Sequence, residues 1–141
     1  MSQRLYLYID GACRGNPGQG GAGAAFLTLA GEIVSKHKKF LGECTNNIAE
    51  YEALLLGLQE AKKQKVKKIE IRADSELLVR QINGQYKVKN PNLQKRFIKA
   101  MKALKAFQYE MVHVRREKNK IADQLANEAI DEHEAILKPM G

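Results

Sequence analysis

The alternation of apolar and polar positions first predicts three strands. Three short apolar runs lie near the start of the chain, each bounded by turn-forming residues, as is typical of strands; they are Leu5–Ile9, Ala24–Leu29 and Ile33–Phe40. The Gly-rich stretch 11–23 separates the first two runs, and Ala30-Gly31 separates the last two. We predict that both separating stretches are turns, so that Asp10 ends the first strand.

A helical period follows these strands. Apolar residues recur every three or four positions from Ile48 to Ala61, which predicts a helix with one apolar face. Polar residues that favour helix N-caps come just before it, namely Thr45, Asn46 and Asn47. Glu50 therefore falls in the first turn of the predicted helix.

The next segment predicts a strand followed directly by a short helix. Residues 66–73 alternate isoleucine with charged side chains, which is typical of a half-buried strand. Ser75 is placed to cap a helix that runs to Ile82 and stops at Asn83-Gly84. Asp74 lies at the junction between the two elements.

The last third of the chain predicts two helices around one strand. Asn90-Pro91 opens a helix with an apolar side and a basic side; the apolar side carries Leu93, Phe97, Met101 and Leu104, and the basic side carries Lys95, Lys99 and Lys102. Residues 107–114 read as a strand, and Asn119 is the predicted cap of a final helix. The order β-β-β-α-β-α-α-β-α indicates an α/β fold, a mixed sheet with helices on its faces.

Length and charge narrow the class of protein. The 141 residues fit a single domain, for which we expect a core over 1–135 and a short tail over 136–141. Lysine and arginine outnumber aspartate and glutamate by 24 to 16, giving a net charge of +8. Such an excess is typical of proteins that bind polyanions, although a lysine-rich surface can also serve solubility alone.

The two cysteines and the apolar run near the N-terminus indicate the cellular compartment that we expect. Cys13 and Cys44 lie in polar stretches without a partner at metal-ligand spacing, so neither a zinc site nor a disulfide framework is expected. The run Leu5–Ile9 is too short for a signal peptide or a membrane span. We expect a soluble protein of the reducing cytoplasm.

Four carboxylates stand at the ends of predicted elements: Asp10, Glu50, Asp74 and Asp123. Singly, each has an ordinary interpretation as a turn residue, a cap or a first-turn charge. A mixed sheet can bring them together, because ligand sites form beyond the carboxyl ends of adjacent parallel strands. Acids without histidine or cysteine favour Mg²⁺ or Mn²⁺. Such a site suits cleavage of phosphodiesters with two metal ions.

Four segments in order resemble the motifs of the type 1 ribonuclease H family: YIDGACRGNPG at 8–18, TNNIAEYEAL at 45–54, ADSE at 73–76 and NKIADQLA at 119–126. The resemblance covers the chain from Leu5 to about Glu128. It implies a ribonuclease H-like fold with five strands in the order 3-2-1-4-5. It also implies a metal site at the four carboxylates and endonucleolytic hydrolysis of the RNA strand of RNA–DNA hybrids.

The resemblance further implies a set of substrate-binding residues: Cys13, Arg14, Asn16, Thr45, Asn46, Asn47 and Glu76. The first three would lie along the hybrid, Thr45 would contact a DNA phosphate, and the asparagine pair would reach base edges or sugars. Glu50 would touch a ribose 2′-hydroxyl, the group that distinguishes RNA from DNA. Glycines 11, 15 and 18 would let the backbone approach the nucleic acid. We expect a monomer.

Three departures from the family pattern stand out. Many members have a histidine in the loop before the last aspartate, whereas VRREKNKIAD at 114–123 has none, and His113 falls in a predicted strand. Many members also insert a basic handle where only residues 84–92 separate two helices here. Glu76 stands where glutamine is frequent, and Glu43 where a basic residue can occur.

Two alternatives to the hydrolase stay open at this point. One is a hybrid- or duplex-binding module of the same fold with weak or lost catalysis, for which the missing histidine argues. The other is a nuclease of this fold with another substrate, as in the related exonucleases and integrases. The intact carboxylates argue against the first, because unpaired acids on a binding face repel phosphates. The stretch from Cys13 to Asn16 and the Asn46-Asn47 pair argue against the second.

Overall fold

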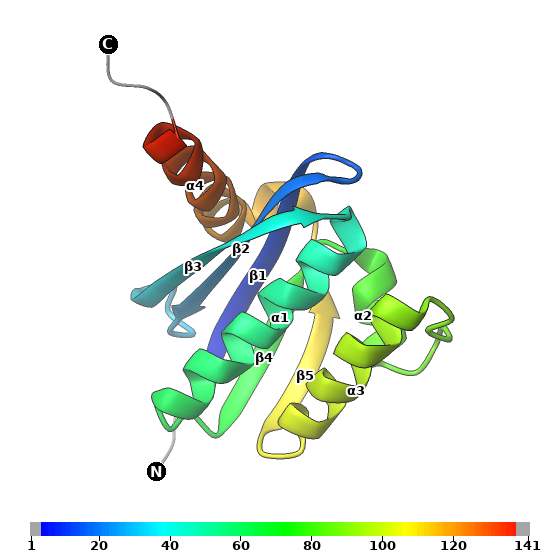
Figure 1. Cartoon of the computed structure of the whole chain (residues 1–141). Helices are drawn as coiled ribbons and strands as arrows, with labels where there is room; N and C mark the ends of the chain where they lie inside the picture. Colours follow the sequence, from blue (N-terminus) through cyan, green and yellow to red (C-terminus); the bar gives the residue numbers. More distant parts are fainter. Residues whose placement is uncertain (1–3, 138–141) are drawn as a thin grey trace.

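The computed structural model describes residues 4–137, which form a mixed sheet with helices on both faces (Figure 1). The elements are β1 (Arg4–Gly15), β2 (Gly18–Leu27), β3 (Ile33–Cys44), α1 (Asn46–Lys63), β4 (Lys68–Ala73), α2 (Glu76–Ile82), α3 (Pro91–Leu104), β5 (Gln108–His113), the 3₁₀ helix η1 (Arg116–Lys118) and α4 (Lys120–Leu137). Apart from η1, the order of elements is the one predicted from the sequence. In residues 4–137 no helix is long and apolar enough to cross a membrane.

The five strands lie in the order β3-β2-β1-β4-β5, which confirms the expected topology. The pairs β1/β2 and β2/β3 are antiparallel, while β1/β4 and β4/β5 are parallel. The helices α1, α2 and α3 lie on one side of the sheet and α4 on the other (Figure 1). The buried side chains of Leu7 and Ile9 face α1. The parallel pairing of β1 with β4 ends at Ile9↔Ala73, so the end of β4 lies beside the middle of β1, with α1 on one side of the sheet and α4 on the other.

The Gly-rich stretch 11–23 is a β-hairpin, so its prediction as one long turn is wrong. The strands β1 and β2 pair from Tyr6↔Leu27 to Gly15↔Gly18. A Cβ on Gly21 would collide with the backbone oxygen of Ala126, and α4 lies equally close over Gly23. Glycine is present here because a helix packs directly on the strand, which a sequence pattern reads as turn chemistry.

Asp10 likewise does not end its strand. Asp10 pairs with Gly23 of β2 inside the hairpin. The parallel pairing of β1 with β4 stops one residue earlier, at Ile9↔Ala73. Asp10 thus lies at the point where β4 turns away from β1. This opening in the sheet leaves space for side chains from other elements.

Two predicted caps, Thr45 and Ser75, are confirmed, and Asn90 is a third cap at the predicted start of its helix. The side chains of Thr45, Ser75 and Asn90 accept hydrogen bonds from the first turns of α1, α2 and α3 respectively. These caps fix where each helix starts and satisfy amide groups that have no partner within the helix. At the other end of the chain α4 reaches Leu137, beyond the expected core end at 135, and the rest of the expected tail lies outside the described residues.

Candidate active site

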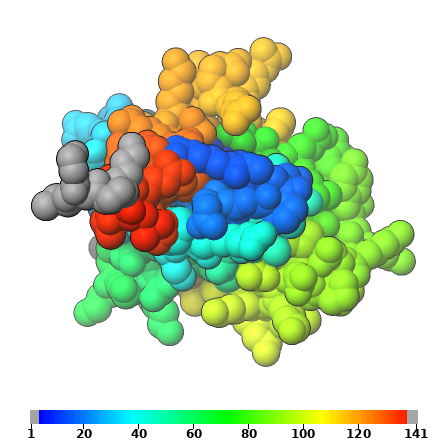
Figure 2. All heavy atoms as spheres, turned by 45° about the horizontal axis from the view of Figure 1, so that its top comes forward, coloured from blue at the N-terminus to red at the C-terminus, as the bar shows by residue number. Residues whose placement is uncertain are grey.

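Three of the four predicted carboxylates converge. Asp10 on β1, Glu50 on α1 and Asp74 after β4 each offer an oxygen, and these oxygens lie within 4.8 Å of one another. We refer to these three residues as the acidic cluster. Figure 2 turns this end of the molecule toward the reader, with the β1–β2 hairpin in blue at its centre, α4 in red on one side and α2 in green on the other.

Gly11 explains how Glu50 enters the acidic cluster. A Cβ at Gly11 would collide with the backbone of Ala49 and Glu50, so only glycine lets the start of α1 lie against β1. The Gly11 N–H donates a hydrogen bond of 2.9 Å to Oε1 of Glu50. Gly11 thus has an intramolecular role, and its expected approach to nucleic acid stays a prediction.

The other oxygen of Glu50 is the clearest sign of a cation site. Glu50 Oε2 is buried and has no hydrogen-bond partner in the protein. Buried polar atoms are nearly always partnered, so an unpartnered carboxylate oxygen facing two other acids calls for a positive ligand. The donors of the cluster are all carboxylates, as Mg²⁺ and Mn²⁺ prefer, and they fit such an ion.

Asp123 stands beside Asp10 but outside this group of three. It lies in the first turn of α4, close enough that a hydrogen bond from Asp10 to its carboxyl raises the pKa of Asp10. The side chain of Asn127 donates to Asp123 Oδ1 at 3.3 Å and to its backbone oxygen at 3.0 Å. The fourth carboxylate is thus oriented from its own helix.

Asn119 positions the cluster and is not the predicted side-chain cap of α4. Its Nδ2 donates to the carbonyl oxygen of Ile9 at 2.8 Å and to Asp74 Oδ2 at 3.1 Å. Its Oδ1 is buried without a partner. The side chain turns toward the sheet because β1 and β4 separate there and leave the Ile9 carbonyl unpaired. The cap interpretation considered only the acceptor oxygen of asparagine, whereas its donor group acts here.

Burial and mutual repulsion raise the pKa values of the two buried acids. The pKa of Asp10 is raised mainly by burial and then by Glu50 and Asp74. Burial also raises the pKa of Glu50, an effect that the neighbouring Asp10 and the Gly11 N–H partly offset. The site without a cation therefore holds a proton where separate carboxylates would be ionised. A cation that replaces this proton removes the repulsion between the acids.

A pocket of about 360 Å³ opens over the acidic cluster. Besides the three acids it is lined by Gly11, Asn46, Asn47, Ser75 and Arg116. Arg116 comes from η1. Its positive charge opposes, in small part, the rise that burial causes in the pKa of Glu50. Arg116 was not predicted as a site residue, because no local pattern shows that η1 turns it toward the site.

A second pocket of similar volume adjoins the first through Asn46 and Asn47, and we call it the amide pocket. Its lining also includes Asn16, Thr45, Asn90 and Asn92. Asn16 Oδ1 accepts the backbone N–H of Asn46 at 3.0 Å, which ties the hairpin to α1. Four predicted substrate-binding residues thus meet here. Asn90 and Asn92 were missed because the Asn-Pro pattern was fully explained by the start of α3.

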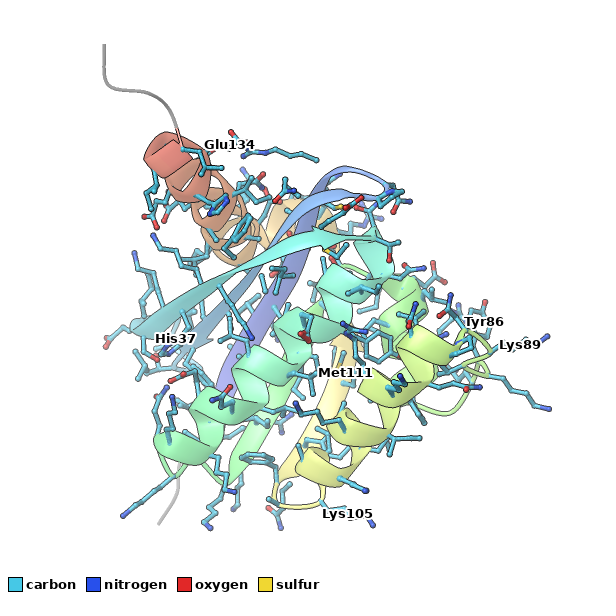
Figure 3. The ribbon with its side chains drawn as sticks, in the orientation of Figure 1. His37, Tyr86, Lys89, Lys105, Met111 and Glu134 are labelled. Carbon is cyan, nitrogen blue, oxygen red and sulfur yellow. The ribbon has the colours of Figure 1, made fainter. Side chains whose placement is uncertain are left out.

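The remaining three predicted substrate residues line neither pocket. The Cys13 thiol lies within hydrogen-bond distance of two backbone oxygens, 2.7 Å from that of Gly15 in the hairpin and 2.9 Å from that of Cys44 at the end of β3. The Arg14 guanidinium forms ion pairs with Asp131 at 2.6 Å and Glu134 at 3.1 Å, both on α4; Figure 3 labels Glu134. Glu76, exposed at the start of α2, pairs with Arg80 at 2.8 Å.

The chain matches a family model described as reverse transcriptase-like over residues 8–129. It is 38% identical to the ribonuclease HI of Halobacterium salinarum, over 92% of this chain and 65% of that protein. It is 31% identical to the ribonuclease H of Pseudomonas putida, over 94% of this chain and 97% of that protein. A mycobacterial bifunctional protein matches over only 36% of its length.

Solved structures of ribonucleases H are also similar to this chain. LC11-RNase H1 in complex with an RNA/DNA hybrid has a TM-score of 0.87 and 41% identity, over 92% of this chain and 98% of that one. The N-terminal RNase H domain of a Mycobacterium tuberculosis protein has a TM-score of 0.91 and 35% identity, over 97% of this chain and 100% of that one. The match over residues 8–129 places the chain in the reverse transcriptase-like class. Within it, this chain belongs to the type 1 ribonuclease H family. It is a form without the basic handle, since residues 83–90 contain no helix, and without the loop histidine.

Proposed function

We propose that this chain hydrolyses the RNA strand of RNA–DNA hybrids endonucleolytically, with two divalent cations held by Asp10, Glu50, Asp74 and Asp123. The observation that carries the proposal is the convergence of three carboxylates within 4.8 Å, together with the buried, unpartnered Oε2 of Glu50. Such an arrangement costs free energy unless a cation is bound. Mg²⁺ or Mn²⁺ is the ion that these ligands favour.

The residues around the acidic cluster have separate roles in the proposed reaction. When bound, the cations supply an activated water and stabilise the leaving oxygen, so that the protein needs no nucleophile of its own. Gly11 orients Glu50 through its N–H, and Asn119 orients Asp74. Asp123, beside Asp10, would complete the ligand set. Arg116 on the rim would attract the phosphate that is cut.

The hybrid would be held by neutral groups near the site and by cations farther away. Asn16, Thr45, Asn46 and Asn47 surround the amide pocket and offer donors and acceptors to phosphates, sugars and base edges. LC11-RNase H1, a relative of the same fold, was solved with an RNA/DNA hybrid. Arg14 would reach the hybrid by exchanging its carboxylate partners on α4 for phosphates, while Cys13 and Glu76 would contact it from the hairpin and from α2.

We also propose that residues 1–141 act as a single domain, as a monomer and in the cytoplasm. The alternative function is a binding module of the same fold without efficient catalysis. The acidic cluster disfavours it, because three acids on a hybrid-binding face repel phosphates unless a cation neutralises them. Arg116 beside Glu50 also suits a site where a phosphate is cut.

The test compares end-labelled RNA–DNA hybrid, double-stranded RNA and DNA duplex, each incubated with the protein in Mg²⁺, in Mn²⁺ or in a chelator. We expect metal-dependent internal cleavage of the RNA strand of the hybrid alone. Analysis of the product ends then identifies which P–O bond breaks. Hybrid binding without cleavage in either metal would establish the binding module instead, and cleavage of a DNA duplex would indicate another nuclease of this fold.

A further inference from the structure

A groove separate from the site lies between α1 and α3, on the helical face of the sheet. It has a volume of about 450 Å³ and an apolar floor made by Leu55, Leu58, Ala103 and Phe107. None of the residues that line it lines the acidic site or the amide pocket. A hollow with an apolar floor commonly marks a site for a partner or ligand.

Three lysines frame this floor, and we call the whole the lysine-rimmed groove. Lys62 comes from α1, and Lys99 and Lys102 come from α3. No aspartate or glutamate is among the residues that line the groove. Within residues 4–137 none of the three lysines forms an ion pair, although cations elsewhere do, such as Lys38 with Glu132 and Arg96 with Glu52. The groove therefore carries uncompensated positive charge.

The lysine-rimmed groove is remote from the acidic cluster. Lys62 follows Glu50 by twelve residues, which is about 18 Å along the axis of α1. On α3, Lys102 lies near the end that Lys105 marks in Figure 3, away from the loop that carries Lys89. A hybrid centred on the acidic cluster would first meet the opposite ends of both helices, which begin beside the amide pocket.

We propose that the lysine-rimmed groove binds an acidic peptide segment that also carries a large apolar side chain. The floor excludes a purely ionic ligand, because phosphates or carboxylates alone would leave Leu55 and Phe107 in water. The rim excludes a purely apolar segment, since it would leave three unpaired lysines around it. Carboxylates next to an apolar side chain satisfy both requirements, and the charges complement one another. The lysine stems add further apolar contact.

The test uses a fluorescein-labelled peptide, Asp-Asp-Leu-Asp-Asp-Phe-Asp-Asp with blocked ends, and the full chain. Fluorescence anisotropy should show saturable binding that weakens with added salt. The same peptide with Leu and Phe replaced by Ser should bind at least about tenfold more weakly, because two buried apolar side chains are lost. Equal binding of the two peptides would overturn the proposal, because it would leave only nonspecific charge attraction.

Matched variants locate the site. The double variant Lys62→Glu, Lys102→Glu should lose about tenfold in affinity through reversed charge. Lys95→Glu, on the same helix but outside the groove, should bind as the wild type does. Ala106 is exposed on the rim of the groove. Ala106→Glu should weaken binding of the peptide without affecting the fold, which a thermal melt would verify.

A nucleic-acid role of the groove is the competing outcome. Asp10→Asn protein, titrated with hybrid, should bind equally well with and without the Lys62→Glu, Lys102→Glu change. Displacement of the peptide by hybrid, or a parallel loss of hybrid affinity in the double variant, would show that the lysine-rimmed groove is part of the nucleic-acid surface and would overturn the proposal. The peptide assay requires no cleavage, so its result is independent of whether the chain is a nuclease.

Discussion

The side-chain amide of Asn119 donates a hydrogen bond of 3.1 Å to Oδ2 of Asp74. The same amide group also donates a hydrogen bond to the carbonyl oxygen of Ile9, the residue before Asp10. One side chain from the start of α4 therefore links the backbone beside Asp10, on β1, to Asp74, which directly follows β4. Because the two strands stop pairing at this point, no backbone hydrogen bond could do the same.

We expect Asn119→Ala to remain folded, with a moderate loss of unfolding free energy, and to lose hybrid cleavage. The loss of the bond to Ile9 leaves a buried carbonyl unpaired, which should cost roughly 1–3 kcal/mol of unfolding free energy. Asp74 would also lose its orienting donor, so Mn²⁺ affinity by calorimetry and hybrid cleavage should both fall. Asn83→Ala is the matched control, because Asn83 also donates to a backbone carbonyl, that of Met111 on β5, and lines neither pocket of the site. If the control lost cleavage equally, Asn119 would have only a structural role.

Asp10→Asn and Asp74→Asn should each abolish hybrid cleavage while leaving hybrid affinity largely intact. Each removes a metal ligand but keeps the shape of the side chain. Without metal the variants should be as stable as the wild type or slightly more so, because one of the repelling acids is neutral. Cleavage assays, binding titrations and thermal melts in a chelator measure the three properties. Near-normal cleavage by Asp10→Asn would remove the central proposal.

The stability of the metal-free protein should fall as pH rises. The pKa values of Asp10 and Glu50 are raised by burial in the folded state, so this state binds protons more tightly than the unfolded chain does. Their contribution is complete below the unfolded pKa of about 4 and is lost as pH rises through the folded values. The loss is up to about 1.4 kcal/mol per pH unit for each extra bound proton.

Urea titrations in a chelator at several pH values measure this slope. Asp10→Asn should flatten it, and saturating Mn²⁺ should reverse it, because the cation binds the ionised acids. A slope that Asp10→Asn leaves unchanged would assign the effect to other groups.

The basic residues in α3 and just before it should not contribute equally to hybrid binding. Lys87 and Lys89 precede Asn90 at the edge of the amide pocket, and Lys95 lies one turn into α3, whereas Lys99 and Lys102 face the lysine-rimmed groove. Neutralising the first three should weaken binding at all sequences and lower the slope of log affinity against log salt by about 0.9 per lost phosphate contact. Neutralising Lys99 and Lys102 should leave that slope unchanged. Anisotropy titrations with Asp10→Asn protein over a range of salt distinguish the two sets.

The missing loop histidine should slow turnover without abolishing it, since acid–base assistance is typically worth about 10² to 10⁴ in rate. His113 is exposed on β5 and Glu117 is exposed in η1, and we expect His113→Ala and Glu117→Ala to retain substantial cleavage. Asp123→Ala should lose most of it. Arg116→Ala should lie between them, because Arg116 lines the site pocket. Single-turnover kinetics on the four variants would contradict this order if His113→Ala lost as much as Asp123→Ala.

The sequence alone determined the elements and the acids that they carry. Helix and strand periods depend on local spacing, and caps such as Thr45 and Ser75 act within one helical turn, so both can be read from neighbouring residues. The positions of Glu50 and Asp74 at element starts and ends followed directly. The four motifs added the strand order, which no local pattern contains.

The tertiary structure decided every feature that depends on two distant segments. Gly11, Gly21 and Gly23 look like turn residues, yet they are strand residues on which helices pack. Asn119 looks like a cap, yet it binds two strands because the sheet opens beside it. The sequence could place Lys62 and Lys102 on their separate helices, but not on one groove. Close approach and unpaired backbone groups arise only when elements meet, and a local pattern does not encode where they meet.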